Sequence, residues 1–250
     1  TRNVSFVGVL NYTLLNRYVV HGSLNAEGNS AMGRNERMGY FPAVGLAWNF
    51  QNEPFMEKAR DKWLDEAKFR FSIGQSGRAP SGASVYLGAY VKGTDYMNMS
   101  ATKQARMQLD NLKWETSTSA NIGLDFGFFD GRINGTIEYY NTKTTDLLVN
   151  KSIPSSLGYL TQTVNLAEMR NNGIEITLNT TPIKTGNFRW DINFTFSKNK
   201  NEIKKIDGQV DENGKPLDDV NNKWFVGHPM NVYYDYVFDG IWQKDDDIAH

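Results

Sequence analysis

Apolar and polar residues alternate along the stretch from Trp114 to Val149. Between Thr116 and Phe128 the even positions become large and apolar, while the odd positions are small, polar or acidic. A period of two predicts a strand with one apolar and one polar face. Asp130-Gly131 follows and tolerates the positive φ angles of a tight turn, after which the alternation resumes at Ile133. The stretch therefore predicts a hairpin of two antiparallel strands.

The length of these strands favours a membrane protein. They run for more than the roughly 5–6 residues of an ordinary strand, and a strand that crosses a bilayer needs about 9–11. Long strands with an apolar outer row and a polar inner row are typical of outer-membrane barrels. A soluble all-β domain that binds carbohydrate or acts as an adhesin also alternates, so the pattern by itself leaves that alternative open.

The same alternation recurs along the rest of the chain. The segment from Gln51 to Glu66 differs and predicts a short helix. Together with the hairpin, the alternating segments predict an all-β fold of about nine antiparallel strands. The seven further strands are predicted at residues 4–12, 17–27, 39–50, 68–78, 173–181, 188–203 and 231–243.

The connections between these strands sort into two kinds. Short turns are predicted at 13–16, 130–131 and 182–187, and aromatic residues lie beside each of them. Long connections are predicted at 28–38, 79–112, 150–170 and 207–230, and only 51–66 breaks the alternation of short and long. Outer-membrane barrels have short periplasmic turns, long extracellular loops and aromatic girdles, so the sorting favours a barrel.

Composition narrows the class further. The 27 basic and 28 acidic residues give no broad attraction to nucleic acid, and the absence of cysteine excludes disulfides and thiolate metal sites. No apolar run approaches the about 18 residues of a membrane helix. The odd strand number and the acidic end at 245–250 predict a segment of a larger barrel, and the missing export signal predicts a chain that is mature or partial.

The sequence predicts no catalytic or metal site and no cofactor. His21, His228 and His250 match no ligand spacing, and Asp211-Glu212-Asn213-Gly214 lacks the flanking ligands of a calcium loop. Polar-face residues would line a wet lumen or touch a plug, with simple solvation as the alternative. Aromatic residues of the long loops would stack on sugar rings or pack on a partner, with packing inside the loop as the alternative. The candidates are Asn121, Asp125, Glu138, Glu175, Arg189 and Asp191 for the lumen, and Tyr86, Tyr90, Tyr96 and Trp224 for the loops.

Several motifs, in order along nearly the whole chain, resemble the barrel of SusC/RagA-type TonB-dependent transporters from the outer membrane of Bacteroidetes. The run from Asn111 to Thr116 that leads into Asn121–Phe126 carries the resemblance most strongly. The sequence of the loop at 28–38 differs from the one usual in the family, and this difference puts only a loop contact in doubt. The other matching segments are Gly39–Ala43, Leu46–Trp48, Lys68–Gly77, Tyr139-Tyr140, Lys143–Leu148, Asn172–Glu175 and Asp239–Gln243.

The resemblance implies a 22-stranded barrel with an N-terminal plug. Residues 1–250 would then be part of one barrel domain, with the plug and the final strands outside this sequence. It also implies active import of a large nutrient, an oligosaccharide or a peptide. The implied partners are a SusD-like surface lipoprotein, the TonB complex through a segment not in this sequence, and outer-membrane lipid.

Overall fold

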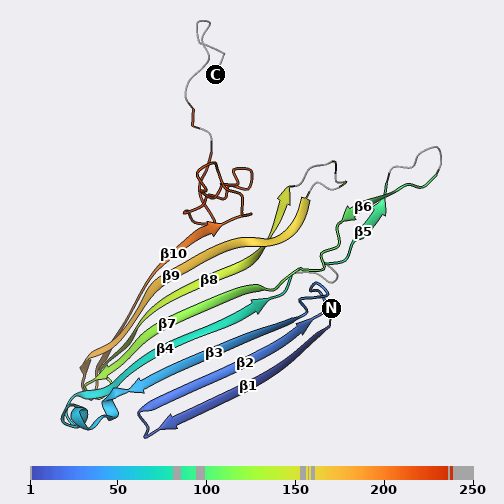
Figure 1. Cartoon of the computed structure of the whole chain (residues 1–250). Coiled ribbons are helices and arrows are strands. Elements are labelled where there is room, and N and C mark those ends of the chain that lie inside the picture. Colours follow the sequence, from blue (N-terminus) through green and yellow to red (C-terminus); the bar gives the residue numbers. More distant parts are fainter. Residues whose placement is uncertain are drawn as a thin grey trace.

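The main body of the structure is one antiparallel sheet, drawn in Figure 1 as a single twisted layer. This computed structural model describes residues 2–80, 86–93, 99–152, 156, 158, 161–235, 237 and 238. The strands of the eight-stranded sheet follow one another in the order β1-β2-β3-β4-β7-β8-β9-β10, and β5 and β6 form a separate hairpin. Their bounds are β1 Asn3–Leu14, β2 Tyr18–Asn29, β3 Met38–Asn49, β4 Leu64–Arg78, β5 Ala89–Lys92, β6 Thr102–Arg106, β7 Glu115–Phe128, β8 Ile133–Ser152, β9 Thr161–Lys184 and β10 Arg189–Lys205.

The pairing register separates the sheet into an apolar face and a polar face. Residues that are direct partners across strands point to the same face. One row on the apolar face runs Tyr12, Val20, Leu46, Phe71, Ile122, Tyr139 and Ile174. The adjacent row on the polar face runs Asn11, His21, Gly45, Ser72, Asn121, Tyr140 and Gly173.

Large side chains of the apolar face are exposed to an unusual degree. Phe6 and Leu10 are each 66% exposed and Phe194 is 53% exposed. An apolar surface of this extent on a soluble monomer would be an aggregation site, so it marks a face that needs a non-aqueous neighbour. On β7 the apolar run from Ala120 to Phe128 spans nine residues, which agrees with the about 9–11 residues that a tilted strand needs to cross a bilayer.

The rows also show that the strands are staggered. A row that starts close to the short-turn end of β1, at Tyr12, reaches Lys198 far from the corresponding end of β10. A stagger that accumulates in one direction across a sheet is the geometry by which barrel strands tilt against the barrel axis. The observed register is therefore that of a barrel wall.

The two ends of the sheet differ as the sequence predicted. Tight turns close the lower end of Figure 1 at 15–17, 129–132 and 185–188. Leu15 and Asn16 both have positive φ, as do Phe129, Asp130 and Gly131. Consecutive positive φ angles belong to the hairpin turns that match strand twist. The longer connections lie at the opposite end, with the exception of 50–63.

Three predicted elements are wrong in extent. The helix expected within 51–66 is limited to two 3-10 turns (Phe50–Asn52 and Pro54–Met56) and α1 (Glu57–Arg60), since β4 begins at Leu64. The loop expected at 150–170 is largely strand, because β8 runs to Ser152 and β9 starts at Thr161. Residues 231–235, 237 and 238 form no strand, and the rest of the strand expected at 231–243 lies outside the described residues.

The extra length of β9 has a physical reason. Residues 161–172 extend along β8 beyond the apolar band, where polar side chains occur on both faces, such as Thr161 and Thr163 on one face and Gln162 on the other. Without a continuous apolar row the sequence shows no alternation of apolar and polar residues. The predicted strand therefore ended where the lipid-facing segment ends. No helix in the described part of the chain is long and apolar enough to cross a membrane.

A small hydrophobic core lies at the long-loop end of the sheet. The ladder between β3 and β4 stops at Ala43 and Gly74. Beyond it Met32, Phe41 and Trp114 pack together, with exposures of 0%, 6% and 6%. The rings of Phe41 and Trp114 meet edge to face at 5.5 Å between centroids. A Cβ at Gly77 would overlap the Phe41 ring, so glycine is required there.

This core, which we call the loop clasp (Met32, Phe41 and Trp114), holds two connections together. The amide of Gly33 donates to the carbonyl of Leu112 at 3.2 Å, and the amide of Asn35 donates to the carbonyl of Asp110 at 3.4 Å. The Asn35 side chain also donates to Asn111 Oδ1 at 3.1 Å. The connections 30–37 and 107–114 are therefore fixed to each other and to the end of the sheet.

Candidate functional site

An ion network crosses three strands on the polar face. Arg70 of β4 donates from Nε and Nη2 to the two carboxylate oxygens of Asp125 on β7, each at 2.8 Å. Its Nη2 also lies 3.4 Å from Glu138 Oε2 on β8. Gly123 lies between them, and a Cβ there would come within 3.0 Å of the guanidinium. Glycine at 123 thus lets Arg70 reach across β7 to the second carboxylate.

The network matters because it neutralises carboxylates in the wall. Glu138 is the direct partner of Glu175 on β9, and like charges directly opposite each other destabilise a sheet. Arg70 offsets the charge of Glu138 on one side. Glu175 itself is exposed and has no cationic partner among the described residues. It is free to contact water or a group that enters the space in front of the polar face.

Replacing Arg70 with methionine should destabilise the folded barrel by about 1–2 kcal/mol. The change leaves Glu138 without its cation and Asp125 with only Lys68, at 3.9 Å, and the figure is reduced because the Arg70 side chain is 36% exposed. Urea unfolding in lipid vesicles would measure it. Arg78→Met is the control, because that side chain is 80% exposed and lies 4.0 Å from Glu115, so its loss should change little. Equal effects of the two substitutions would contradict a role for the network.

The four predicted polar-face residues of β7, β8 and β9 lie on one face, as the register shows for Asn121, Asp125, Glu138 and Glu175. Arg189 and Asp191 are near the short turn of β10 and pair with each other at 2.8 Å. Asp191 also accepts a hydrogen bond of 2.6 Å from the Thr181 hydroxyl. This pair closes the end of the β9–β10 hairpin and is separate from the network around Arg70.

The irregular connection 50–63 brings a carboxylate to the aromatic residues at the short-turn end. Glu53 is 7% exposed. Its Oε1 accepts hydrogen bonds from the Tyr18 hydroxyl at 2.6 Å and the Trp48 indole at 3.0 Å, and Arg17 lies 3.3 Å from Oε2. The hydrogen bonds from Tyr18 and Trp48 lower the pKa of Glu53. The carboxylate fixes the polar ends of two girdle aromatics.

This arrangement predicts an acid-sensitive contact. Because the folded-state pKa of Glu53 lies below its ordinary value of 4.5, its contribution to stability is present above that pH and is lost as the pH falls through the folded-state pKa. The protein should therefore lose stability relative to Glu53→Gln as the pH is lowered below about 4.5. Unfolding midpoints of both proteins across this range test it, and parallel pH profiles would contradict it.

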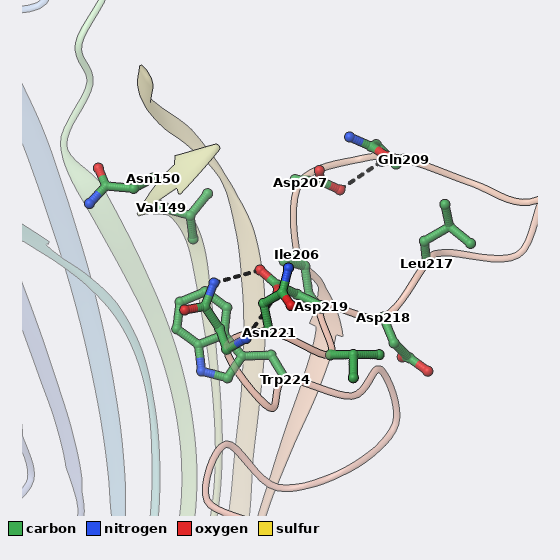
Figure 2. Close-up of a pocket in the computed structure, with 12 residues that line it drawn as sticks. Val149, Asn150, Ile206, Asp207, Gln209, Leu217, Asp218, Asp219, Asn221 and Trp224 are labelled. Carbon is green, nitrogen blue, oxygen red and sulfur yellow. Dashed lines mark hydrogen bonds between the residues drawn. The ribbon is translucent and has the colours of Figure 1, made fainter. Parts of the chain in front are cut away.

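A cavity of about 400 Å³ lies where the connection after β10 folds over the end of β8 (Figure 2). Asp207, Asp218 and Asp219 supply carboxylates, and Trp224 supplies an aromatic face. None of the described residues that line the cavity is a lysine or arginine. The remaining lining residues are Val149, Asn150, Ile206, Gln209, Leu217, Val220, Asn221 and Asn222.

The carboxylates of this cavity are also used to hold the loop in shape. Asp219 accepts from the amide of Asn222 at 3.0 Å and from its side chain at 2.7 Å, and Asp218 accepts from the amide of Val226 at 2.7 Å. Trp224 is paired with Asp219 through two backbone hydrogen bonds of 2.9 Å. The walls are therefore preorganised, with carboxylate and amide oxygens left to accept hydrogen bonds from hydroxyl or amino groups.

The structure separates the aromatic loop candidates. Trp224 lines the cavity just described and also an apolar pocket with Leu148, Met169 and Ile203. Tyr90 lies on β5 of the β5–β6 hairpin, and Tyr86 lies in the segment that leads into it. The carbonyl of Tyr86 accepts a hydrogen bond of 2.8 Å from the amide of Leu109. Tyr96 lies outside the described residues. Tyr86 and Tyr90 therefore do not form one platform with Trp224.

Sequence reasoning missed Arg70, Glu53 and the loop clasp. Arg70 and Glu53 find their partners only after strand pairing, and no local spacing announces such a contact. The clasp had a local signal, since Trp114 stands in the strongest of the matching motifs. The Asp211–Gly214 segment forms a tight turn in which Asp211 Oδ1 accepts from the amides of Asn213 and Lys215 at 2.9 and 2.8 Å. No group of metal-ligating side chains is found in the part of the chain that the structure describes.

Comparison with known proteins agrees with this geometry. The chain is 36% identical to the TonB-dependent receptor SusC of Bacteroides thetaiotaomicron over 94% of its own length. It is 31% identical to a TonB-dependent receptor of Formosa agariphila over 98% of its length. It spans 25% of the length of each of these relatives.

The fold recurs in solved structures as well. The RagAB peptide transporter superposes with a TM-score of 0.79 at 22% sequence identity, over 91% of this chain and 25% of that one. The family model described as "TonB dependent receptor-like, beta-barrel" matches residues 1–246. This match excludes the alternative of a soluble all-β domain, because the family consists of outer-membrane barrels. The chain belongs to the TonB-dependent receptor β-barrel family.

Proposed function

We propose that this chain is part of the barrel of an outer-membrane transporter that imports a nutrient too large for porins, with energy supplied through TonB. The observation that carries the proposal is the family match over residues 1–246. Its relative SusC is described as a TonB-dependent receptor, as are the Formosa relatives. We propose further that the whole protein consists of this barrel domain, completed by further strands, and a plug, and that a SusD-like lipoprotein covers its extracellular end.

The two faces of the sheet fit this role. The apolar face would meet lipid, and the polar face would line the lumen and contact the plug. In that arrangement Glu175 is a carboxylate of the wall with no cationic partner among the described residues, so it is a candidate for contact with a plug residue or with cargo. Its partner on β8, Glu138, is already engaged by Arg70. The work that we propose for this protein is the selection and passage of cargo.

The cavity at Trp224 indicates which cargo would be accepted there. Among the described lining residues, the carboxylates of Asp218 and Asp219 and several amides, with no lysine or arginine, disfavour anionic ligands and suit neutral polyhydroxylated or cationic ones. A flat indole face offers stacking to a sugar ring or a peptide side chain. We propose a neutral oligosaccharide or a peptide without net negative charge as the cargo class.

Uptake by cells that carry the full-length transporter tests the proposal. Labelled neutral oligosaccharides, acidic oligosaccharides and peptides of graded length would be offered to wild-type cells, to cells without TonB and to cells without the lipoprotein. The proposal expects uptake of one neutral or cationic class, lost without TonB and reduced without the lipoprotein. Uptake that persists in the absence of TonB would overturn active transport.

Trp224→Ala should raise the cargo concentration at half-maximal uptake several-fold at an unchanged protein level, because one stacking face is lost. Tyr90→Ala is the matched control on the separate β5–β6 projection and should have the smaller effect. An equal or larger effect at Tyr90 would place the cargo site on the hairpin instead.

A further inference from the structure

Positive charge gathers on the apolar face where the apolar band ends. On β10 the band stops at Phe196 and is followed by Lys198 and Lys200. On β9 it stops at Ile174 and is followed by Arg170 on the same face, and on β8 it stops at Tyr139 and is followed by Lys143. We call the group of Lys143, Arg170, Lys198, Lys200 and Lys204 the basic rim.

The basic rim is not a reflection of the overall composition. The whole sequence is balanced at 27 basic and 28 acidic residues. Within the rim, five cations are accompanied by two carboxylates, Glu168 and Glu202. Lys143 lies 3.0 Å from Glu168, and Lys200 lies 3.1 Å from Glu202, which Lys204 also contacts at 2.5 Å. A local excess of positive charge remains after these pairs are counted.

Two cations of the rim, Arg170 and Lys198, form no ion pair among the described residues. Arg170 donates a hydrogen bond of 2.8 Å from Nε to Asn141 Oδ1. The other N–H groups of its guanidinium remain available to an anion. Lys198 has no ion pair within the described residues and is exposed, as are Arg170 and Lys200. Arg170 is the direct cross-strand partner of Lys143 on β8 and of Glu202 on β10, and the Glu202 carboxylate is already paired with Lys200 and Lys204.

The position of the rim indicates what that anion is. The rim lies on the lipid side of the wall, continuous with the apolar band, and at the end of the sheet that carries the long connections. In an outer-membrane barrel this end is extracellular. A ligand there must place acyl chains against Phe196 and Ile174. Its anionic group must lie beside the basic residues that follow the apolar band on the same face. Basic clusters at this level of a membrane protein bind anionic lipid headgroups.

We propose that the basic rim is a binding site for a phosphorylated glycolipid of the outer leaflet, with its phosphate held by Arg170, Lys198 and Lys200. The guanidinium would grip the phosphate with paired N–H groups and the lysines would supply point charges. The acyl chains would lie along the apolar face of β9 and β10. The proposal concerns the lipid side of the wall and does not depend on which cargo the barrel carries.

The test is lipid binding by the full-length transporter in detergent, measured by native mass spectrometry. The probe is lipid A with its phosphates, compared with enzymatically dephosphorylated lipid A. The variant Lys198→Gln/Lys200→Gln removes two rim cations. The matched control Lys58→Gln/Lys62→Gln removes two lysines from the connection at the opposite end of the sheet. Heat-dependent mobility on SDS gels reports whether each barrel is folded.

We expect the rim variant to bind phosphorylated lipid A roughly tenfold more weakly than wild type, since each cation near a charged membrane surface contributes substantially to binding. The control variant should bind as wild type does, and dephosphorylated lipid A should bind all three proteins alike. Millimolar inorganic phosphate should not displace the lipid.

Three results would overturn the proposal. The first is equal binding of the two forms of lipid A by the wild type. The second is equal retention of phosphorylated lipid A by the wild type and the rim variant. The third is loss of the lipoprotein partner from the rim variant with lipid binding intact, because the rim would then be a protein interface. Cargo uptake by the rim variant should be unchanged, which separates this proposal from the transport function.

Discussion

Replacing Trp114 with alanine is expected to release the two connections that the loop clasp holds together. The indole is 6% exposed and packs on Phe41 and Met32, and truncating a buried tryptophan costs about 3–5 kcal/mol. The loss should be local, because the clasp lies at the end of the sheet and local stability differs from global stability. Amide hydrogen exchange should therefore rise in residues 30–37 and 107–114.

Two further variants sharpen this prediction. Trp114→Phe should be milder, because the indole Nε1 is buried without a hydrogen-bond partner among the described residues, so no bond is lost with it. Trp63→Ala removes a tryptophan that is 43% exposed at the opposite end of the sheet, and it should leave exchange in the two connections unchanged. If Trp63→Ala accelerates the same amides, the clasp is not what holds them.

An arginine in place of Leu124 is expected to destabilise the folded barrel by about 2–4 kcal/mol, the cost of a cation on the lipid face near the bilayer midplane. Leu124 lies mid-band on β7, with Phe69 and Ile137 as its direct partners. The control Asn121→Arg places the same charge three residues away on the polar face, where it should cost much less. Unfolding in urea with the protein in vesicles would compare the two.

The alternation that identifies the faces also limits what the sequence can predict. Between Ala120 and Phe128 one face must meet lipid, so every second residue is apolar and the strand is visible. Above the band that requirement ends, and the stretch 161–172, in which polar and apolar residues are mixed, gave no signal although most of it pairs with β8. The helix predicted within 51–66 was too long. Residues from Leu64 onward belong to β4, in which Leu64 and Ala67 are buried.

The site was predicted less completely than the fold. Asp125 and Glu138 were recognised as polar-face residues, but their cation, Arg70, lies 55 and 68 positions away and becomes their neighbour only through pairing. Trp224 was identified from its residue type and its place in a long loop. The carboxylates that line the cavity of Trp224 could not be identified from the sequence. Asp218 and Asp219 are positioned by turns that the sequence does not specify uniquely.

The central claim is that the even positions of β7 face lipid and the odd positions face water. Nitroxide labels at single cysteines in positions 119, 120, 121, 122 and 124 of the full-length transporter in membranes test it, since the sequence has no cysteine of its own here. Collision rates with oxygen and with a water-soluble nickel complex are the measurement. The structure predicts that 120, 122 and 124 favour oxygen and that 119 and 121 favour nickel. Rates without a period of two, or with the two sets exchanged, would contradict the barrel wall described above.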